Sequence, residues 1–166
     1  MAKVITFSRV FPTYHPKAGQ PTYFVEKFLK GRPTTIEKTA WNPEKSLIEQ
    51  LPMALDMWAE FKPKYHTIRA GKRWNEGDYF SPRVWSGKPY NSKMITIAPD
   101  TLIKKVYDFK IRSGRFFINN YKVEIESVLY DVAHNDGLVR KDLFEWFKYP
   151  NDFDGQIICW NENVKY

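Results

Sequence analysis

The residues best suited to bind an anionic or aromatic ligand lie in one window of the chain. Phe61–Lys93 contains eight basic and two acidic residues. A cluster of positive charge in an otherwise mixed chain is typical of proteins that bind nucleic acid. Within the window, Arg83–Tyr90 (RVWSGKPY) interleaves cationic and aromatic residues with Gly and Pro. The alternative is that these charges form an ordinary solvated surface.

Six residues of this window are the candidate ligand-binding residues. They are Arg69, Trp74, Arg83, Trp85, Lys88 and Tyr90. The cations are expected to pair with phosphates, and the rings are expected to stack on bases at the rim of a cleft. For each ring taken singly, burial in the hydrophobic core is the competing interpretation, because large aromatic side chains commonly fill cores.

Lys64 and Thr67 lie three residues apart in the same window. Side chains alternate between the two faces of a strand, so a strand that included both residues would separate them. They can share a cavity if Lys64 lies in a turn before the strand, and Pro63 favours such a turn. A threonine hydroxyl is a weak nucleophile, and a lysine becomes a base only when burial or a nearby cation lowers its pKa.

Composition excludes several classes of protein. The 166 residues are 43% hydrophobic and 17% aromatic, which predicts a single domain with a substantial core. Cys159 is the only cysteine, so an intrachain disulfide is excluded. The sequence contains no run of about 18 apolar residues, so it predicts no membrane span, and it shows no signal peptide. We therefore expect a cytoplasmic protein. His15, His66 and His134 are widely spaced, and we expect neither a metal nor a cofactor.

The elements that must position these residues are mostly strands. Strands are expected over Lys3–Phe11, Tyr65–Ile68, Tyr79–Trp85, Met94–Ala98, Thr101–Arg112, Tyr121–Tyr130 and Gly155–Trp160. Helices are expected over Thr22–Leu29, Pro43–Trp58 and Leu138–Phe147, the last of them capped by Asp136. The mixture predicts an α+β fold, a mixed and closed β-barrel of five to seven strands with two or three helices packed outside. Residues 1–60 are expected to elaborate this single domain with one strand and helices.

Short motifs in this region resemble a known family. The segment Lys64-x-x-Thr67-Ile68-Arg69, with Gly77-Asp78 after it, resembles the ASCH family, a branch of the PUA-like β-barrels. Asn135–Leu138 (NDGL), Glu145–Phe147 (EWF) and Gln156–Trp160 (QIICW) are similar to the C-terminal part of that family. The resemblance covers Phe61–Trp160 and implies a PUA-like barrel with a cleft for RNA or a modified nucleoside.

The resemblance also implies three candidate catalytic residues. One branch of the family hydrolyses the amide of N4-acetylcytidine with a Lys, a Thr and a Glu, and the Lys and Thr fall on Lys64 and Thr67. Counting back seven residues from Leu143 places the carboxylate on Asp136, one methylene shorter than the Glu. The alternative is that Lys64 and Arg69 bind phosphate while Asp136 only caps a helix.

Two functions of different classes therefore stay open. The first is an RNA- or nucleotide-binding module with a basic, aromatic-rimmed cleft. The second is an amidohydrolase that removes an acyl group from N4-acetylcytidine-type nucleosides through Lys64, Thr67 and Asp136. Both predict RNA or a modified nucleoside as the partner and no membrane. A third interpretation, a protein-interaction module, rests only on the acidic C-terminal third of the chain.

Overall fold

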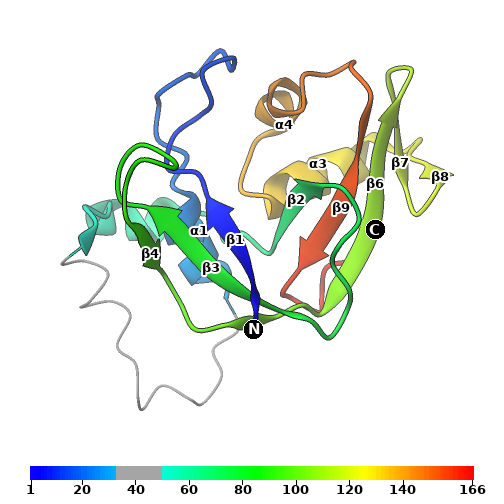
Figure 1. Ribbon diagram of the computed structural model, residues 1–166. Helices are drawn as coiled ribbons and strands as arrows, with labels where there is room; N and C mark the ends of the chain where they lie inside the picture. The colour runs from blue at the N-terminus through cyan, green and yellow to red at the C-terminus, as the bar shows by residue number, and fades with distance from the viewer. Residues whose placement is uncertain (33–49) are drawn as a thin grey trace.

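Two β-sheets with short helices beside them make up the structure (Figure 1). The computed structural model describes residues 1–32 and 50–166. The helices are α1 (Phe24–Gly31), the 3-10 helix η1 (Leu55–Glu60), α3 (Glu126–Asn135) and α4 (Arg140–Trp146). The strands are β1 (Lys3–Phe7), β2 (His66–Ala70), β3 (Tyr79–Trp85), β4 (Met94–Thr96), β5 (Thr101–Leu102), β6 (Lys105–Arg112), β7 (Arg115–Ile118), β8 (Tyr121–Lys122) and β9 (Phe153–Cys159).

The two sheets differ in how their strands run. In the first sheet, β3 pairs in parallel with β1 and antiparallel with β4 and β5. The second sheet has the order β2-β9-β6-β7-β8, and all of its neighbouring strands are antiparallel. The first and last predicted strands therefore lie in different sheets, β1 in the first and β9 in the second.

The predicted closed barrel is wrong, although the fold is α+β. Within the described residues, β1 pairs only with β3 and β2 pairs only with β9, so no ladder joins the two sheets. A side chain spans the gap between these edges instead, because Nη2 of Arg69 on β2 donates to the carbonyl oxygen of Thr6 on β1 at 2.5 Å. The guanidinium takes the place of a strand-to-strand hydrogen bond and leaves the two sheets open along this seam.

An aromatic cluster holds the two sheets together. Phe7 of β1, Phe28 of α1, Phe80 of β3 and Trp160, which follows β9, are all buried. The ring of Trp160 lies 5.1 Å from that of Phe28 and 5.7 Å from that of Phe80, measured between centroids. Burial of such large rings removes apolar surface from water, which is the main favourable contribution to packing. The sheets are thus joined through their core.

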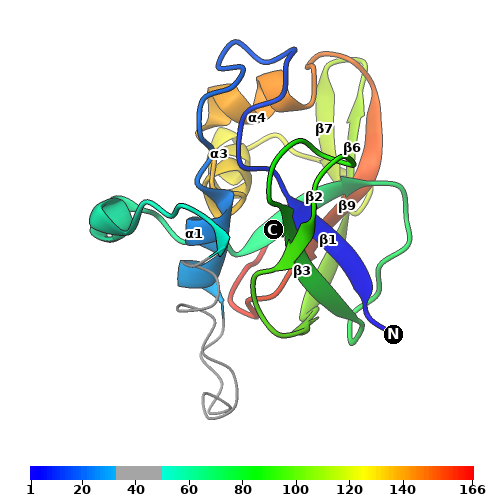
Figure 2. The same cartoon turned by 60° about the vertical axis from the view of Figure 1, so that its left-hand side comes forward.

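The helices lie along one side of the two sheets (Figure 2). The predicted C-terminal helix is confirmed as α4, and α1 replaces the predicted Thr22–Leu29 helix with a shift of two residues. Residues 43–49 of the predicted helix over Pro43–Trp58 lie outside the described residues. In the described remainder, residues 51–54 are not helical, and only the end of the predicted helix overlaps η1. Across the described residues, no helix is long and apolar enough to cross a membrane.

The predicted strand over Tyr121–Tyr130 is wrong in its second half. Only Tyr121–Lys122 pairs as β8, and the chain then enters α3. Leu129, Val132 and Ala133 of α3 are buried, and this spacing of three and four residues is that of one helix face. The alternation of apolar and charged residues before Glu126 does not continue, so the helical periodicity decides the structure of the second half.

A close backbone approach makes Gly31 a stringent test of how α1 packs. A Cβ at this position would lie 2.1 Å from the carbonyl oxygen of Lys64. We expect Gly31→Ala to lower the free energy of unfolding by about 2 kcal/mol or more, because the backbones must move apart. Urea denaturation followed by tryptophan fluorescence measures this value.

Gly87→Ala is the matched control, because a Cβ there would make only an ordinary contact with Ser92, 3.5 Å away. Its free energy of unfolding should stay within about 0.5 kcal/mol of the wild type. Equal stability of the two variants would show that α1 does not pack against Lys64 in this way.

Candidate functional site

A cavity of about 180 Å³ lies at the open seam between the two sheets. Its wall is formed by residues of β1, α1 and β2, by the end of β3 and the turn after it, and by the C-terminal ends of α3 and α4 with the residues that follow them. The lining residues are Thr6, Phe7, Ser8, Phe24, Lys64, Thr67, Ile68, Arg69, Trp85, Pro89, Tyr90, Asp136, Trp146 and Phe147. The structure therefore brings together six of the sequence-predicted site residues, Lys64, Thr67, Arg69, Trp85, Tyr90 and Asp136.

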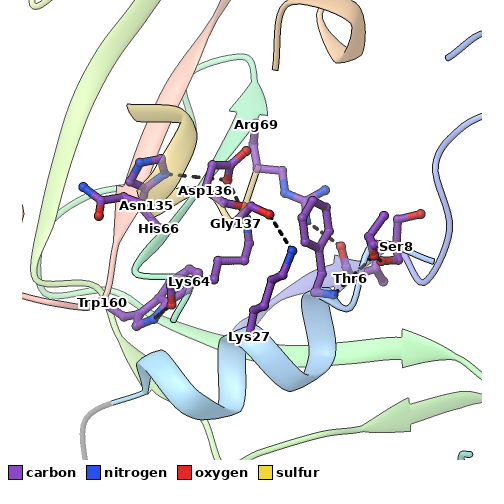
Figure 3. A network of polar contacts seen from close by, with 12 residues as sticks. Thr6, Ser8, Lys27, Lys64, His66, Arg69, Asn135, Asp136, Gly137 and Trp160 are labelled. Carbon is purple, nitrogen blue, oxygen red and sulfur yellow. Dashed lines mark hydrogen bonds and ion pairs between the residues drawn. The ribbon is translucent and has the colours of Figure 1, made fainter. Parts of the chain in front are cut away.

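A buried ion pair forms the polar floor of the cavity (Figure 3). Nζ of Lys64 donates to Oδ1 of Asp136 and to the backbone carbonyl oxygen of Asp136, each at 2.5 Å. The side chains of Lys64 and Asp136 are only 1% and 7% exposed. The carboxylate of Asp136 therefore reaches the lysine although it is one methylene shorter than a glutamate.

The backbone around Lys64 is held from three sides. Its N–H donates to the carbonyl oxygen of Lys27 on α1 at 2.9 Å. Its carbonyl oxygen accepts a hydrogen bond from Nε1 of Trp160 at 3.0 Å. The next residue, Tyr65, donates its N–H to the carbonyl oxygen of Asn135 at 2.8 Å, which ties this segment to the end of α3. These bonds place Lys64 before β2, in the position that lets it share a cavity with Thr67.

Burial moves the pKa values of both charged groups toward their neutral forms. The pKa of Lys64 is lowered to about 8, chiefly by desolvation, and the Coulombic attraction of Asp136 opposes this shift. Desolvation also raises the pKa of Asp136, against the attraction of Lys64. The lowered pKa makes Lys64 easier to deprotonate than an exposed lysine, and the neutral amine can accept a proton from a hydroxyl group.

Thr67 and Arg69 lie two residues apart on β2 and both line the cavity. Thr67 is 5% exposed. Its hydroxyl makes no hydrogen bond to any residue in the described part of the chain, 1–32 and 50–166. Arg69 is half-buried, and its Nη2 donates a hydrogen bond to the carbonyl oxygen of Thr6. Desolvation lowers its pKa, and the attraction of Asp136 opposes that shift. The wall thus carries an unbonded hydroxyl beside a fixed guanidinium.

Aromatic side chains form the rim of the cavity. Tyr90 is 88% exposed, and its ring centroid lies 5.4 Å from that of Trp85. Trp85 is the last residue of β3, and Tyr90 lies in the turn between β3 and β4. Lys88 of the same turn is exposed and does not line the cavity. Trp146 and Phe147, at the end of α4, also line the cavity. A flat ligand that enters the cavity therefore meets several aromatic rings.

Two other candidate ligand-binding residues lie away from the cavity. Trp74 is 2% exposed and belongs to the hydrophobic core, so the competing core interpretation is correct for this ring. Arg83 lies within β3, and its Nε donates to Oγ of Ser81 at 3.2 Å. The sequence placed both in a basic and aromatic window. The fold of the β2–β3 loop buries Trp74 in the core, and Arg83 does not reach the cavity although it shares a face of β3 with Trp85.

Asp136 does not cap α4 as predicted. The N-cap of α4 is Val139, which makes no side-chain hydrogen bond there, and Asp136 ends α3 instead, with its N–H bonded to Val132 and Ala133. This position frees the carboxylate for Lys64. It also brings Oδ1 of Asp136 to 3.7 Å from Nδ1 of His66, a fully buried histidine whose pKa lies well below its ordinary value, chiefly through desolvation.

Sequence reasoning missed the cavity residues that come from β1 and α1. Thr6, Ser8 and Phe24 line the cavity, and the ring of Phe24 lies 4.4 Å from Nζ of Lys64. The helical spacing of Phe24 and Phe28 was a signal for the buried face of α1, but nothing in the sequence pointed that face at Lys64. In residues 1–32 and 50–166, no three His, Cys, Asp or Glu side chains cluster to hold a metal ion.

Comparisons with protein-family models, with curated proteins and with solved structures found no match to this chain. The geometry of the cavity therefore carries the functional argument.

The pKa of Lys64 can be measured without any ligand. In protein labelled with carbon-13 at the lysine Cε, we expect one resonance to titrate near pH 8 and to disappear in Lys64→Met. Because this value lies below the ordinary 10.5, unfolding takes up a proton between these pH values. The stability contributed by Lys64 therefore rises with pH over this range. A Lys64 resonance that moves only above about pH 10 would contradict this electrostatic description.

Proposed function

We propose that this protein binds a nucleoside, free or as one nucleotide of RNA, in the cavity between the two sheets. The observation that carries the proposal is that Lys64, Thr67 and Asp136 line the same cavity as Trp85 and Tyr90. Polar groups at the floor suit the edge of a base, and rings at the rim suit its faces. The net charge of +7 favours an anionic partner such as RNA.

The size of the cavity supports a base-sized ligand. Pockets for whole drug-sized molecules measure roughly 300–1,000 Å³. The cavity here is smaller, about 180 Å³, and suits one base with its sugar outside. The sugar and any phosphates would then lie near the β3–β4 turn, which carries the exposed cations Lys88 and Lys93 and no acidic residue. The resemblance to the ASCH family agrees with such a ligand.

A stacking variant tests the binding proposal. We expect Tyr90→Ala and Trp85→Ala each to weaken binding of cytidine, or of a single-stranded RNA pentamer with one cytosine, by about 5-fold or more, because a base–aromatic stack contributes about 1–3 kcal/mol. Isothermal titration calorimetry measures the dissociation constants.

Tyr121→Ala is the matched control, because Tyr121 is also highly exposed but lies on β8, away from the cavity. It should bind like the wild type. Binding of the pentamer alone would identify RNA as the ligand, and binding of both would identify the nucleoside. Equal affinity of wild type, Tyr90→Ala and Tyr121→Ala for both probes would overturn the proposal.

Amide hydrolysis is the second candidate function. It is favoured by the unbonded hydroxyl of Thr67 and by the lowered pKa of Lys64 in the same cavity. Neutral Lys64 would take the hydroxyl proton while the Thr67 oxygen forms a bond to the acyl carbon of N4-acetylcytidine. The C–N bond then breaks as the proton passes to the leaving amine. Water hydrolyses the acyl-threonine, and the products are cytidine and acetate.

Single-turnover kinetics with N4-acetylcytidine test this chemistry. We expect Thr67→Ala to lower the rate by about a hundred-fold or more, because the nucleophile is lost, while Thr67→Ser retains part of it. The wild-type rate should rise with pH and level off near pH 8, as Lys64 loses its proton. Lys64→Arg should abolish the reaction, because a guanidinium stays protonated. An unchanged rate in Thr67→Ala would exclude this mechanism and leave the binding proposal intact.

A further inference from the structure

A lysine of α1 contacts both segments that carry the ion pair of the cavity floor (Figure 3). The backbone oxygen of Lys27 accepts the N–H of Lys64 at 2.9 Å. Its side chain reaches in the other direction, and Nζ donates to the carbonyl oxygen of Gly137 at 2.7 Å. Lys27 is not among the residues that line the cavity. Its contacts are with the groups behind the wall of the cavity.

Two successive carbonyl groups are each held by a lysine. Lys64 binds the carbonyl oxygen of Asp136, and Lys27 binds that of Gly137. Gly137 has a φ of +81°, and a Cβ at this position would lie 3.2 Å from Cδ of Lys27. The lysine stem thus packs directly against the glycine. The Gly137–Leu138 peptide is thereby held against α1 at the point where the chain turns from α3 toward α4.

We propose that Lys27 is a positioning residue, which holds the carbonyl group of Gly137 against α1 and so keeps the carboxylate of the preceding residue, Asp136, on Lys64. The role rests on the proposed function, because the ion pair matters only if it meets a ligand. The position of Asp136 can nevertheless be measured in the free protein, through its effect on the charge of Lys64.

Positioning and simple charge repulsion predict opposite changes at Lys64. The groups that act on Lys64 are Asp136, Arg69 and Lys27, with His66 on the far side of Asp136. Lys27 itself faces Asp142, Glu26, Asp136 and Lys17. Loss of the Lys27 charge alone would raise the pKa of Lys64, because a like charge is removed. Loss of positioning would lower it, because Asp136, the group that favours the charged lysine, moves away.

The experiment follows the carbon-13 signal of Lys64 in Lys27→Met over the range from about pH 6 to about pH 11. We expect the apparent pKa of Lys64 to fall by about one pH unit, the effect of withdrawing an opposite charge. Lys27→Arg, which keeps a cationic donor, should restore the wild-type titration. An unchanged or raised pKa of Lys64 in Lys27→Met would overturn the proposal.

Lys30→Met is the matched control. Lys30 lies one turn later on α1, and its Nζ donates to the backbone oxygen of Trp58 at 2.8 Å, so this variant also removes a bond from lysine to carbonyl. It should leave the Lys64 titration unchanged, and a fall as large as that of Lys27→Met would overturn the proposal.

If Lys27→Met fails to fold, Lys27→Gln provides the same readout, because its amide is one atom too short to reach Gly137. A pKa of Lys64 that stays at the wild-type value in Lys27→Gln would again overturn the role. Because no ligand is used, this result stands apart from the binding and kinetic tests. If those tests fail but the pKa of Lys64 is lowered in Lys27→Met, the proposed function is rejected and the positioning role of Lys27 is retained.

Discussion

The burial of one ammonium–carboxylate pair constrains the whole site. Removing a charge from water costs several kcal/mol unless an opposite charge compensates. Lys64 and Asp136 can therefore be buried only in contact with each other. They are 72 residues apart in the sequence, and their contact brings the segment before β2 to the end of α3. The hydrogen bond from Tyr65 to Asn135 follows this junction. Because each charge depends on the other, the cavity floor is built as a unit.

The open seam between the sheets gives this floor its access. A continuous ladder between β1 and β2 would join the two sheets along these edges and fill the space with backbone. Arg69 binds Thr6 across the gap instead, and the space beside this contact becomes the cavity. Polar groups from both edges then face the cavity, while the Phe7–Phe28–Phe80–Trp160 cluster holds the sheets together deeper in the core. The proposal of a nucleoside ligand rests on this combination of a polar floor and an aromatic opening.

The N-terminal segment takes part in this arrangement, although the ASCH resemblance begins only at Phe61. α1 supplies Gly31, whose lack of a side chain permits close contact with the Lys64 backbone. Phe24 places its ring beside the Lys64 ammonium, and Phe28 joins the aromatic cluster. The same helix therefore contributes to the core and to the electrostatic surroundings of the site. Its sequence shows an amphipathic helix and gives no hint of what the helix covers.

Several strands were predictable because local periodicity reports local structure, and β3 has the predicted bounds. The sequence also singled out Lys64, Thr67, Arg69, Trp85 and Tyr90, which the structure places around one cavity. Trp74 was misplaced because a basic and aromatic composition does not distinguish a core ring from a rim ring. Asp136 was assigned to the wrong helix end, because an acid between two helices fits either the end of the first or the start of the second.

Sequence alone determined which side chains are present, their charges and the period of each element. The tertiary structure alone decided that the barrel stays open, that Lys64 and Asp136 are buried as a pair, and that Lys27 of α1 holds the peptide behind them. The physical reason is that hydrogen-bond pairing and desolvation depend on the distance between atoms in space. Residues such as Lys27 and Gly137 are 110 positions apart, and no spacing rule along the chain relates them.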